Sequence, residues 1–128
     1  MGSAARAGIC LAAGLLITAV GGCTIRGPVP PRPALSSYGC MAAVVRDRVP
    51  AQLPDKRAHC QAAGLIARYC SVGEAYLAGA GKELRDLLGG GDAEWADWRA
   101  DRNGIRCARN ATSDAQIAAC CAARCAAR

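Results

Sequence analysis

Cysteine is the residue type with the most chemical potential in this 128-residue chain, which has nine cysteines and one histidine. Such a density of thiols serves disulfide bonds, thiol–disulfide exchange or metal binding. Three of the cysteines gather in the run CCAARC at residues 120–125. Seven lie downstream of a proline-rich strip that begins at Pro28, namely Cys40, Cys60, Cys70, Cys107, Cys120, Cys121 and Cys125. The residues beside them decide between the three chemistries.

The neighbours of these cysteines favour structural disulfides. A reactive thiol pair usually sits at a helix N-terminus, where the helix dipole lowers the thiol pKa. The CCAARC run falls late in an expected helix, where the dipole opposes thiolate formation. A zinc site needs about four ligands, and the single imidazole, His59, is adjacent to Cys60, so the two side chains diverge on a helix. A thiol-redox or metal-handling site at Cys120, Cys121 and Cys125 is the alternative interpretation.

Acidic and aromatic side chains form a second group of candidates, between residues 92 and 102. Arginines lie among the acids, as on the solvated face of a helix, so a paired-carboxylate site is not expected. The two tryptophans are expected in the core, with an exposed anchor for a partner protein as the alternative. One histidine without a nucleophile–histidine–acid set gives no hydrolase signature. These residues are Asp92, Glu94, Trp95, Asp97, Trp98, Arg99, Asp101 and Arg102.

The composition predicts a thin core that needs covalent support. Apolar residues make up 52 % of the chain, but alanine is frequent among them, phenylalanine is absent and aromatics reach only 4 %. Alanine buries little area and therefore contributes little hydrophobic free energy. Small domains with such cores usually depend on disulfides. The net charge of +6 is scattered along the chain without aromatic stacking positions, which argues against nucleic-acid binding.

The N-terminal segment has the organisation of a secretory signal peptide. Arg6 precedes an uncharged run at residues 7–20, which as a helix would span about 21 Å, short of the roughly 30 Å hydrocarbon layer. The run ends in Val20-Gly21-Gly22-Cys23, which resembles the lipobox of bacterial lipoproteins. The resemblance implies cleavage before Cys23, attachment of a diacylglyceryl group with palmitate-like chains to its thiol, and acylation of the new N-terminus.

The same resemblance implies a location. The protein would lie in a bacterial cell envelope, anchored to the inner or outer membrane and facing the oxidising periplasm. Pro28, Pro30, Pro31 and Pro33 then predict an extended tether, which at about 3.1 Å per residue would hold the domain about 30 Å from the membrane. The folded part resembles small Cys-rich lipoproteins of proteobacteria, a likeness that conveys location and no activity.

Helical periodicity continues through residues 35–128, where five short helices are expected. The expected N-terminal caps or capping boxes are Ser36 or Ser37, Asp55, Ser71 with Glu74, Asp92, and Ser113 with Gln116. Asn103-Gly104 is expected to end the fourth helix. Gly79 and Gly81 predict close approach of another helix of the domain, with a smooth surface for a partner as the alternative. The expected core stripes are Tyr38, Met41, Val44 and Val45; Ala62, Leu65, Ile66 and Tyr69; and Leu77, Ala80, Leu84, Leu87 and Leu88.

Removal of Cys10 with the signal peptide and lipidation of Cys23 would leave seven thiols, which predicts three disulfides and one unpaired cysteine. Cys60 and Cys70 would lie about 15 Å apart along one helix, too far to bond to each other. The bonds should therefore run between helices. The favoured arrangement clamps the second helix, through Cys60 and Cys70, to the Cys107 region and the last helix, but the full pairing stays open.

Together these patterns predict an all-α bundle of about five short helices stapled by disulfides. Its parts are a lipoprotein signal peptide at 1–22, a lipidated Cys23 with a proline-rich tether at 23–34, and a Cys-rich helical domain at 35–128. The expected function is a non-catalytic binding or structural role. The expected partners are the membrane, through the lipid on Cys23, and an envelope protein. No metal and no cofactor other than this covalent lipid is expected.

Overall fold

A computed structural model describes residues 27–89 and 94–126, without the side chains at 86 and 87. These residues form five α-helices and no strand, which confirms the predicted all-α class. In the described ranges no helix is both long enough and apolar enough to span a bilayer. The signal-peptide run, Cys23 and Asp92 lie outside the described residues. The helices are α1 (Ser37–Arg48), α2 (Asp55–Tyr69), α3 (Val72–Gly89), α4 (Trp95–Asn110) and α5 (Asp114–Arg124).

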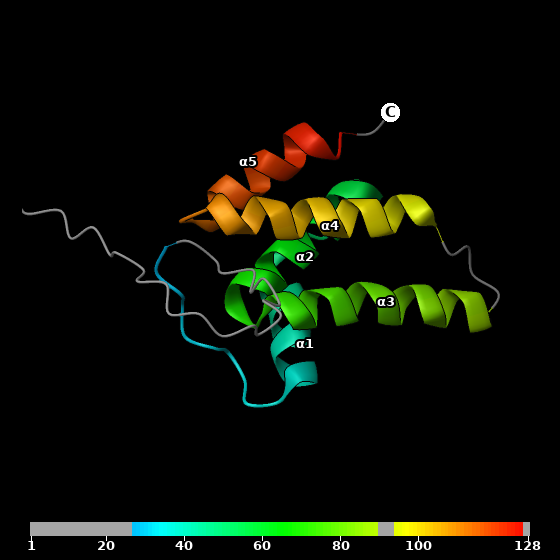
Figure 1. Cartoon of the computed structure of the whole chain (residues 1–128), viewed down its shortest axis with the longest axis horizontal. Coiled ribbons are helices and arrows are strands. Elements are labelled where there is room, and N and C mark those ends of the chain that lie inside the picture. The colour runs from blue at the N-terminus through cyan, green and yellow to red at the C-terminus, as the bar shows by residue number, and fades with distance from the viewer. Residues whose placement is uncertain (1–26, 90–93, 127–128) are drawn as a thin grey trace, which may run out of the picture.

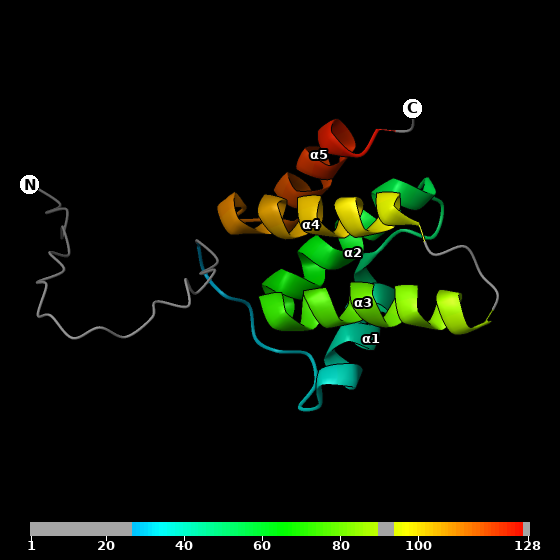
Figure 2. The same cartoon turned by 45° about the vertical axis from the view of Figure 1, so that its right-hand side comes forward.

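Helix α2 is the centre of the bundle and contacts each of the other four helices. Helices α3 and α4 run antiparallel across it, α5 lies on the outer side of α4, and α1 lies on the opposite side, next to α3 (Figure 1, Figure 2). Small side chains fill most of the core. The largest fully buried ones are Ile66, Ile105, Ile117, Val44 and three cysteines. The core is therefore as thin as the composition predicts.

The backbones of α2 and α4 approach each other closely where the helices cross, at Gly64 and Gly104. A Cβ on Gly104 would overlap the carbonyl oxygen of Cys60, and a Cβ on Gly64 would lie 2.8 Å from the carbonyl oxygen of Gly104. Gly104 lies inside α4, which continues to Asn110, so the prediction that it ends the helix was wrong. Glycine inside a helix costs about 1 kcal/mol relative to alanine. The close crossing is the structural reason for its presence.

Helix α3 turns its leucines to solvent. The exposed fractions of Leu77, Leu84 and Leu88 are 65 %, 56 % and 78 %. Ala80 is exposed as well, so the prediction that this stripe forms core was wrong. The side chain at 87 lies outside the described part of the chain. The spacing of the leucines correctly predicted an apolar side of α3. The prediction that this side faces the core was wrong, because it faces solvent.

Two small residues, Ala75 and Gly79, lie on the inner side of α3. Ala75 is fully buried, and Gly79 lies directly against the carboxylate of Asp101 on α4. The predicted close approach is therefore confirmed at Gly79. It does not extend to Gly81, where a Cβ would meet nothing within 4 Å. Small inner residues allow α3 to lie close to α4 while the leucines point away.

Three of the predicted helix caps are confirmed. The hydroxyls of Ser36, Ser71 and Ser113 accept backbone N–H bonds from the residue three positions later, at 3.1, 3.1 and 3.3 Å. Asp55 is instead the first residue of α2, after Pro54. In the predicted stripe of α1, Val44 is buried, whereas Tyr38 is 81 % exposed. Local capping chemistry was thus easier to predict than the direction each helix faces.

Alanine at Gly104 is expected to force α2 and α4 apart. The free energy of unfolding should fall by at least about 2 kcal/mol, because the new methyl group meets backbone rather than a movable side chain. The matched control is Gly81→Ala, at an open position, which should raise the free energy of unfolding by up to about 1 kcal/mol. Thermal unfolding with the disulfides intact, followed by circular dichroism, measures both. Equal melting temperatures for the two variants would contradict the close crossing.

Candidate functional site

Three disulfides connect the helices. Cys40–Cys70 joins α1 to the end of α2, Cys60–Cys121 joins α2 to α5, and Cys107–Cys120 joins α4 to α5, with Cα–Cα distances of 6.0, 5.7 and 5.8 Å. Among the described cysteines only Cys125 is unpaired. The predicted count of three bonds and one free thiol is therefore confirmed for this part of the chain.

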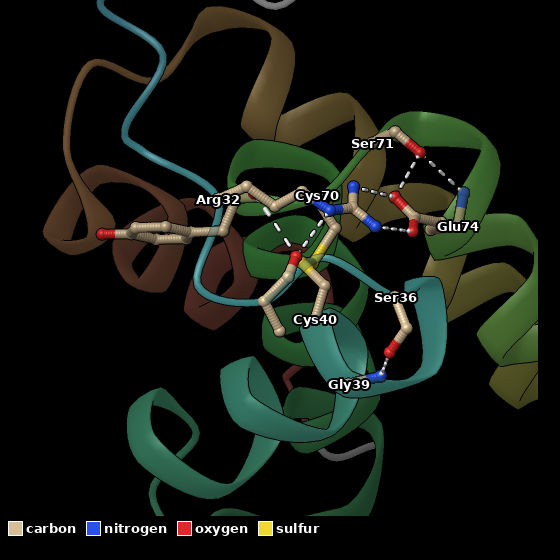
Figure 3. Close-up of a disulfide and its surroundings, with 9 residues drawn as sticks. Arg32, Ser36, Gly39, Cys40, Cys70, Ser71 and Glu74 are labelled. Atoms are coloured by element: carbon tan, nitrogen blue, oxygen red, sulfur yellow. Dashed lines mark hydrogen bonds and ion pairs between the residues drawn. A yellow bond between two sulfur atoms is a disulfide. The ribbon is translucent and has the colours of Figure 1, made fainter.

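The pairing follows the expected arrangement only in part. Cys60 bonds to the last helix as predicted. Cys70 does not bond to the last helix or near Cys107, because it caps the C-terminal end of α2, where Cys40 of α1 lies beside it (Figure 3). Adjacent Cys120 and Cys121 point to different helices and therefore bond to α4 and α2 separately.

The C-terminal cysteines form a covalent staple. The sulfur atoms of Cys60, Cys107 and Cys121 lie within 4.8 Å of one another, and all three residues are buried. Each of them takes part in a disulfide. Burial raises the pKa of the remaining thiol, Cys125, above its ordinary value. A raised pKa lowers the thiolate fraction and therefore the reactivity of this thiol.

A half-buried polar cluster joins α2, α3 and α4, and it was not predicted from the sequence. Its members are Lys56 and His59 of α2, Lys82 of α3, and Asp97 and Asp101 of α4. Asp97 and Asp101 are only 2 % and 4 % exposed, so the prediction of a solvated face was wrong for these two acids. Their four-residue spacing, which places both on one side of a helix, was the signal available in the sequence. The neighbouring Arg99 and Arg102 are exposed, as predicted.

Asp97 is the acid that holds the three helices together. Its carboxylate accepts hydrogen bonds from Lys56 at 2.5 Å and from Lys82 at 2.8 Å. Burial acts to raise the pKa of Asp97, but the two ammonium groups outweigh it, and the pKa lies below its ordinary value. Lys56 also binds Asp55 and Glu94. Asp97 is therefore ionised at neutral pH and paired with Lys56 and Lys82.

His59 is oriented by a second acid. Its Nδ1 lies 3.2 Å from Asp101 Oδ1, and its Nε2 lies 3.5 Å from Asp97 Oδ2 and 3.8 Å from Asp55 Oδ1. The hydrogen bond to Asp101 raises the pKa of His59, against the opposing effect of burial. Asp55, His59 and Asp97 are close enough to share a cation, but the ammonium groups of Lys56 and Lys82 already bind Asp97.

A groove of about 570 Å³ opens beside this cluster, between α1, α2 and α3. Its floor is apolar and includes Met41 and Ile66, and its rims include Tyr38, Val45 and Leu77. His59, Lys82, Arg85 and Asp101 form its polar end. The residues that line the groove include no serine, threonine or cysteine, so the histidine–aspartate pair has no such nucleophile there to activate. The arrangement suits binding better than group transfer.

The two tryptophans have different surroundings. Trp98 is half-buried and lies against Tyr76 of α3, with ring centroids 5.9 Å apart. Trp95 is 67 % exposed at the start of α4, so the expectation of a core position was wrong for this residue. The alternative of an exposed anchor for a partner protein thus applies only to Trp95.

The proline-rich strip contacts the domain at two points. The Arg32 guanidinium donates to both carboxylate oxygens of Glu74, at 2.9 and 2.5 Å, on the first turn of α3 (Figure 3). Gly27, with φ of +102°, lies against Thr112. The hydrogen bonds from Arg32 lower the pKa of Glu74 to about 2, despite its burial. Residues 23–34 were expected to act as a tether, and their described part, 27–34, contacts the domain at these two points.

The fold and its staples define the class of protein: a small, disulfide-stapled helical domain. Comparison with family models, curated proteins and solved structures finds no match to the chain. The function is therefore argued from the residues themselves.

His59 is expected to contribute stability that depends on pH. A group whose pKa is raised in the folded state stabilises the fold fully below its unfolded pKa of about 6.5, and this contribution is lost as pH rises through the folded pKa. The groups that face it are Asp55, Asp97, Asp101 and Lys82. The difference in free energy of unfolding between the native protein and His59→Gln should be larger at pH 5 than at pH 9. A difference that grows with pH would contradict the pairing with Asp101.

Glu74 is expected to show the opposite dependence. Because its pKa is lowered to about 2, the stability from its ion pair is present above the unfolded pKa of about 4.3 and is lost as pH falls towards 2. Arg32→Gln should therefore lower the melting temperature at pH 7 and change it little at pH 2. The matched control is Arg46→Gln, which removes an exposed pair with the adjacent Asp47 and should have a small effect at both pH values.

Proposed function

We propose that the protein is a bacterial envelope lipoprotein whose helical domain has a non-catalytic binding or structural role. Acyl chains on Cys23 hold it in the inner or outer membrane, and the domain faces the periplasm. The observation that supports this best is the oxidation state: six of the seven cysteines from Cys40 onward are in disulfides. Disulfides persist in exported proteins and are rare in the cytosol. The Val20–Cys23 sequence supplies the anchor.

The disulfides suit a rigid scaffold. In the chain-entropy description, Cys60–Cys121, with a sequence separation of 61, stabilises the fold by about 4 kcal/mol. Cys107–Cys120, with a separation of 13, contributes about 3 kcal/mol. These contributions offset the small hydrophobic free energy of a core that consists largely of alanine and cysteine. A scaffold of this kind can present the groove and the outer side of α3 to a partner in a fixed geometry.

A thiol-redox or metal-handling role at the C-terminal cysteines is less well supported. It needs at least two accessible thiols, whereas Cys120 and Cys121 are both in disulfides. Cys125 is buried and its pKa is raised by that burial. The scaffold role requires no labile thiol and therefore fits these cysteines better.

Cys23→Ser should release the protein from the membrane. Cells expressing the full chain should yield a membrane-bound protein that takes up a fatty-acid label, because the acyl chains provide the anchor. The substitution is expected to abolish the fatty-acid label and to move the protein out of the membrane fraction. The matched control is Cys10→Ser, within the predicted signal peptide, which should leave both unchanged. Labelling that persists in Cys23→Ser, or is lost in Cys10→Ser, would contradict the proposal.

A further inference from the structure

The outer side of α3 is a continuous apolar stripe, here called the α3 leucine face. At 100° per residue, Leu77, Leu84 and Leu88 point within about 40° of one another. Along the helix Ala80 and Gly81 lie between Leu77 and Leu84, one on each side of the line of leucines, and all five residues are exposed. No charged residue lies within this stripe. Exposed apolar surface of this extent usually marks an interaction site.

The face is self-complementary. We propose that it packs against the same face of a second copy of the chain, with the two α3 helices antiparallel and related by a two-fold axis. With the axis between Ala80 and Gly81, Leu77 lies opposite Leu84 of the second copy. Ala80 lies opposite Gly81, and Leu88 lies opposite Gly73. Small residues meet at the centre, and leucines meet on either side of it.

The open space at Gly81 fits this arrangement. A Cβ there would meet nothing within 4 Å, unlike Gly79, which is in contact with Asp101. Packing inside one copy therefore gives no reason for glycine at position 81, although glycine weakens a helix by about 1 kcal/mol. Close approach of another helix at this point gives such a reason.

The charges beside the face favour the antiparallel arrangement. Arg85 is the exposed charged residue next to the leucines, whereas Lys82 points to Asp97 inside the domain. In the antiparallel register Arg85 lies opposite Tyr76, whereas a parallel pair would place Arg85 against Arg85. Antiparallel helices also bring the positive end of each macrodipole next to the negative end of the other. Charge and dipole thus select the same orientation.

The size of the face predicts a weak pair. The 18 residues of α3 span about 27 Å. Leu77 also lines the groove with Tyr38 and Val45 of α1, so Leu84 of the second copy lies at the mouth of that groove. A contact two helices wide covers on the order of 500 Å² on each copy, near the lower limit for specific interfaces. The dimer should therefore form only where the local concentration of the chain is high.

This inference goes beyond the proposed function and does not require the lipid anchor on Cys23.

The test is photo-crosslinking of the full chain in cells. A benzophenone amino acid is placed at Leu77, and adducts are separated under denaturing conditions and identified by mass spectrometry. The expected adduct has twice the mass of the chain and joins position 77 to residues near Leu84. The same probe at the exposed Ala119 of α5 should give no such adduct. Membrane attachment is read separately from the fatty-acid label, so either proposal can fail without the other.

Gly81→Leu distinguishes a second copy from other occupants. The leucine fits a single copy, so the melting temperature should not fall, but it would clash with Ala80 of the second copy. The dimer adduct should fall at least about tenfold, equivalent to about 1.4 kcal/mol. The control Ala119→Leu should change it less than about twofold. A lipid would accept the added leucine at least as well.

Three results would overturn the inference. The first is the absence of a dimer adduct from position 77. The second is an adduct to lipid or to a different protein in place of the dimer. The third is a dimer adduct that Gly81→Leu leaves unchanged or increases. A dimer adduct that is lost in Gly81→Leu and kept in Ala119→Leu supports it.

Discussion

The backbone contact between Gly64 of α2 and Gly104 of α4 is the constraint on which the rest of the structure depends. It allows two helices to cross without side chains between them. At that distance Asp97 and Asp101 of α4 reach the basic residues of α2 and α3. A wider crossing would separate Asp97 from Lys56 and Asp101 from His59, and would weaken the pairing that compensates the burial of these acids.

The same crossing explains how so small a core can hold. Helix α5 lies over α4, and its two adjacent cysteines reach back to α2 and α4. Helix α3 has no disulfide and is held instead by Lys82 bound to Asp97 and by Glu74 bound to Arg32. Its inner side can then be small, which leaves its leucines free for contacts outside the domain. Covalent and ionic links take the place of large apolar side chains.

The sequence predicted the local features well. The all-α class, the serine caps and the count of three disulfides with one free thiol all followed from capping chemistry, periodicity and cysteine number. The contacts between residues of different helices could not be predicted from the sequence. Asn103-Gly104 has the sequence of a helix end, and only the contact with α2 explains its place inside α4. Periodicity showed that α3 has an apolar side, but not that Gly79 on the opposite side faces Asp101. The burial of Asp97 depends on lysines 41 and 15 positions away, which no local pattern reveals.

We propose that this protein exists as an oxidised, acyl-anchored scaffold. The most direct measurement is the intact mass of the protein taken from its native membrane, alkylated in denaturant before reduction, followed by mapping of the linked peptides. The expected result is a mass that begins at an acylated Cys23, a single alkylated thiol at Cys125, and a peptide that links Cys60 to Cys121. Three or more alkylated thiols, or a link from Cys60 to any other cysteine, would contradict it.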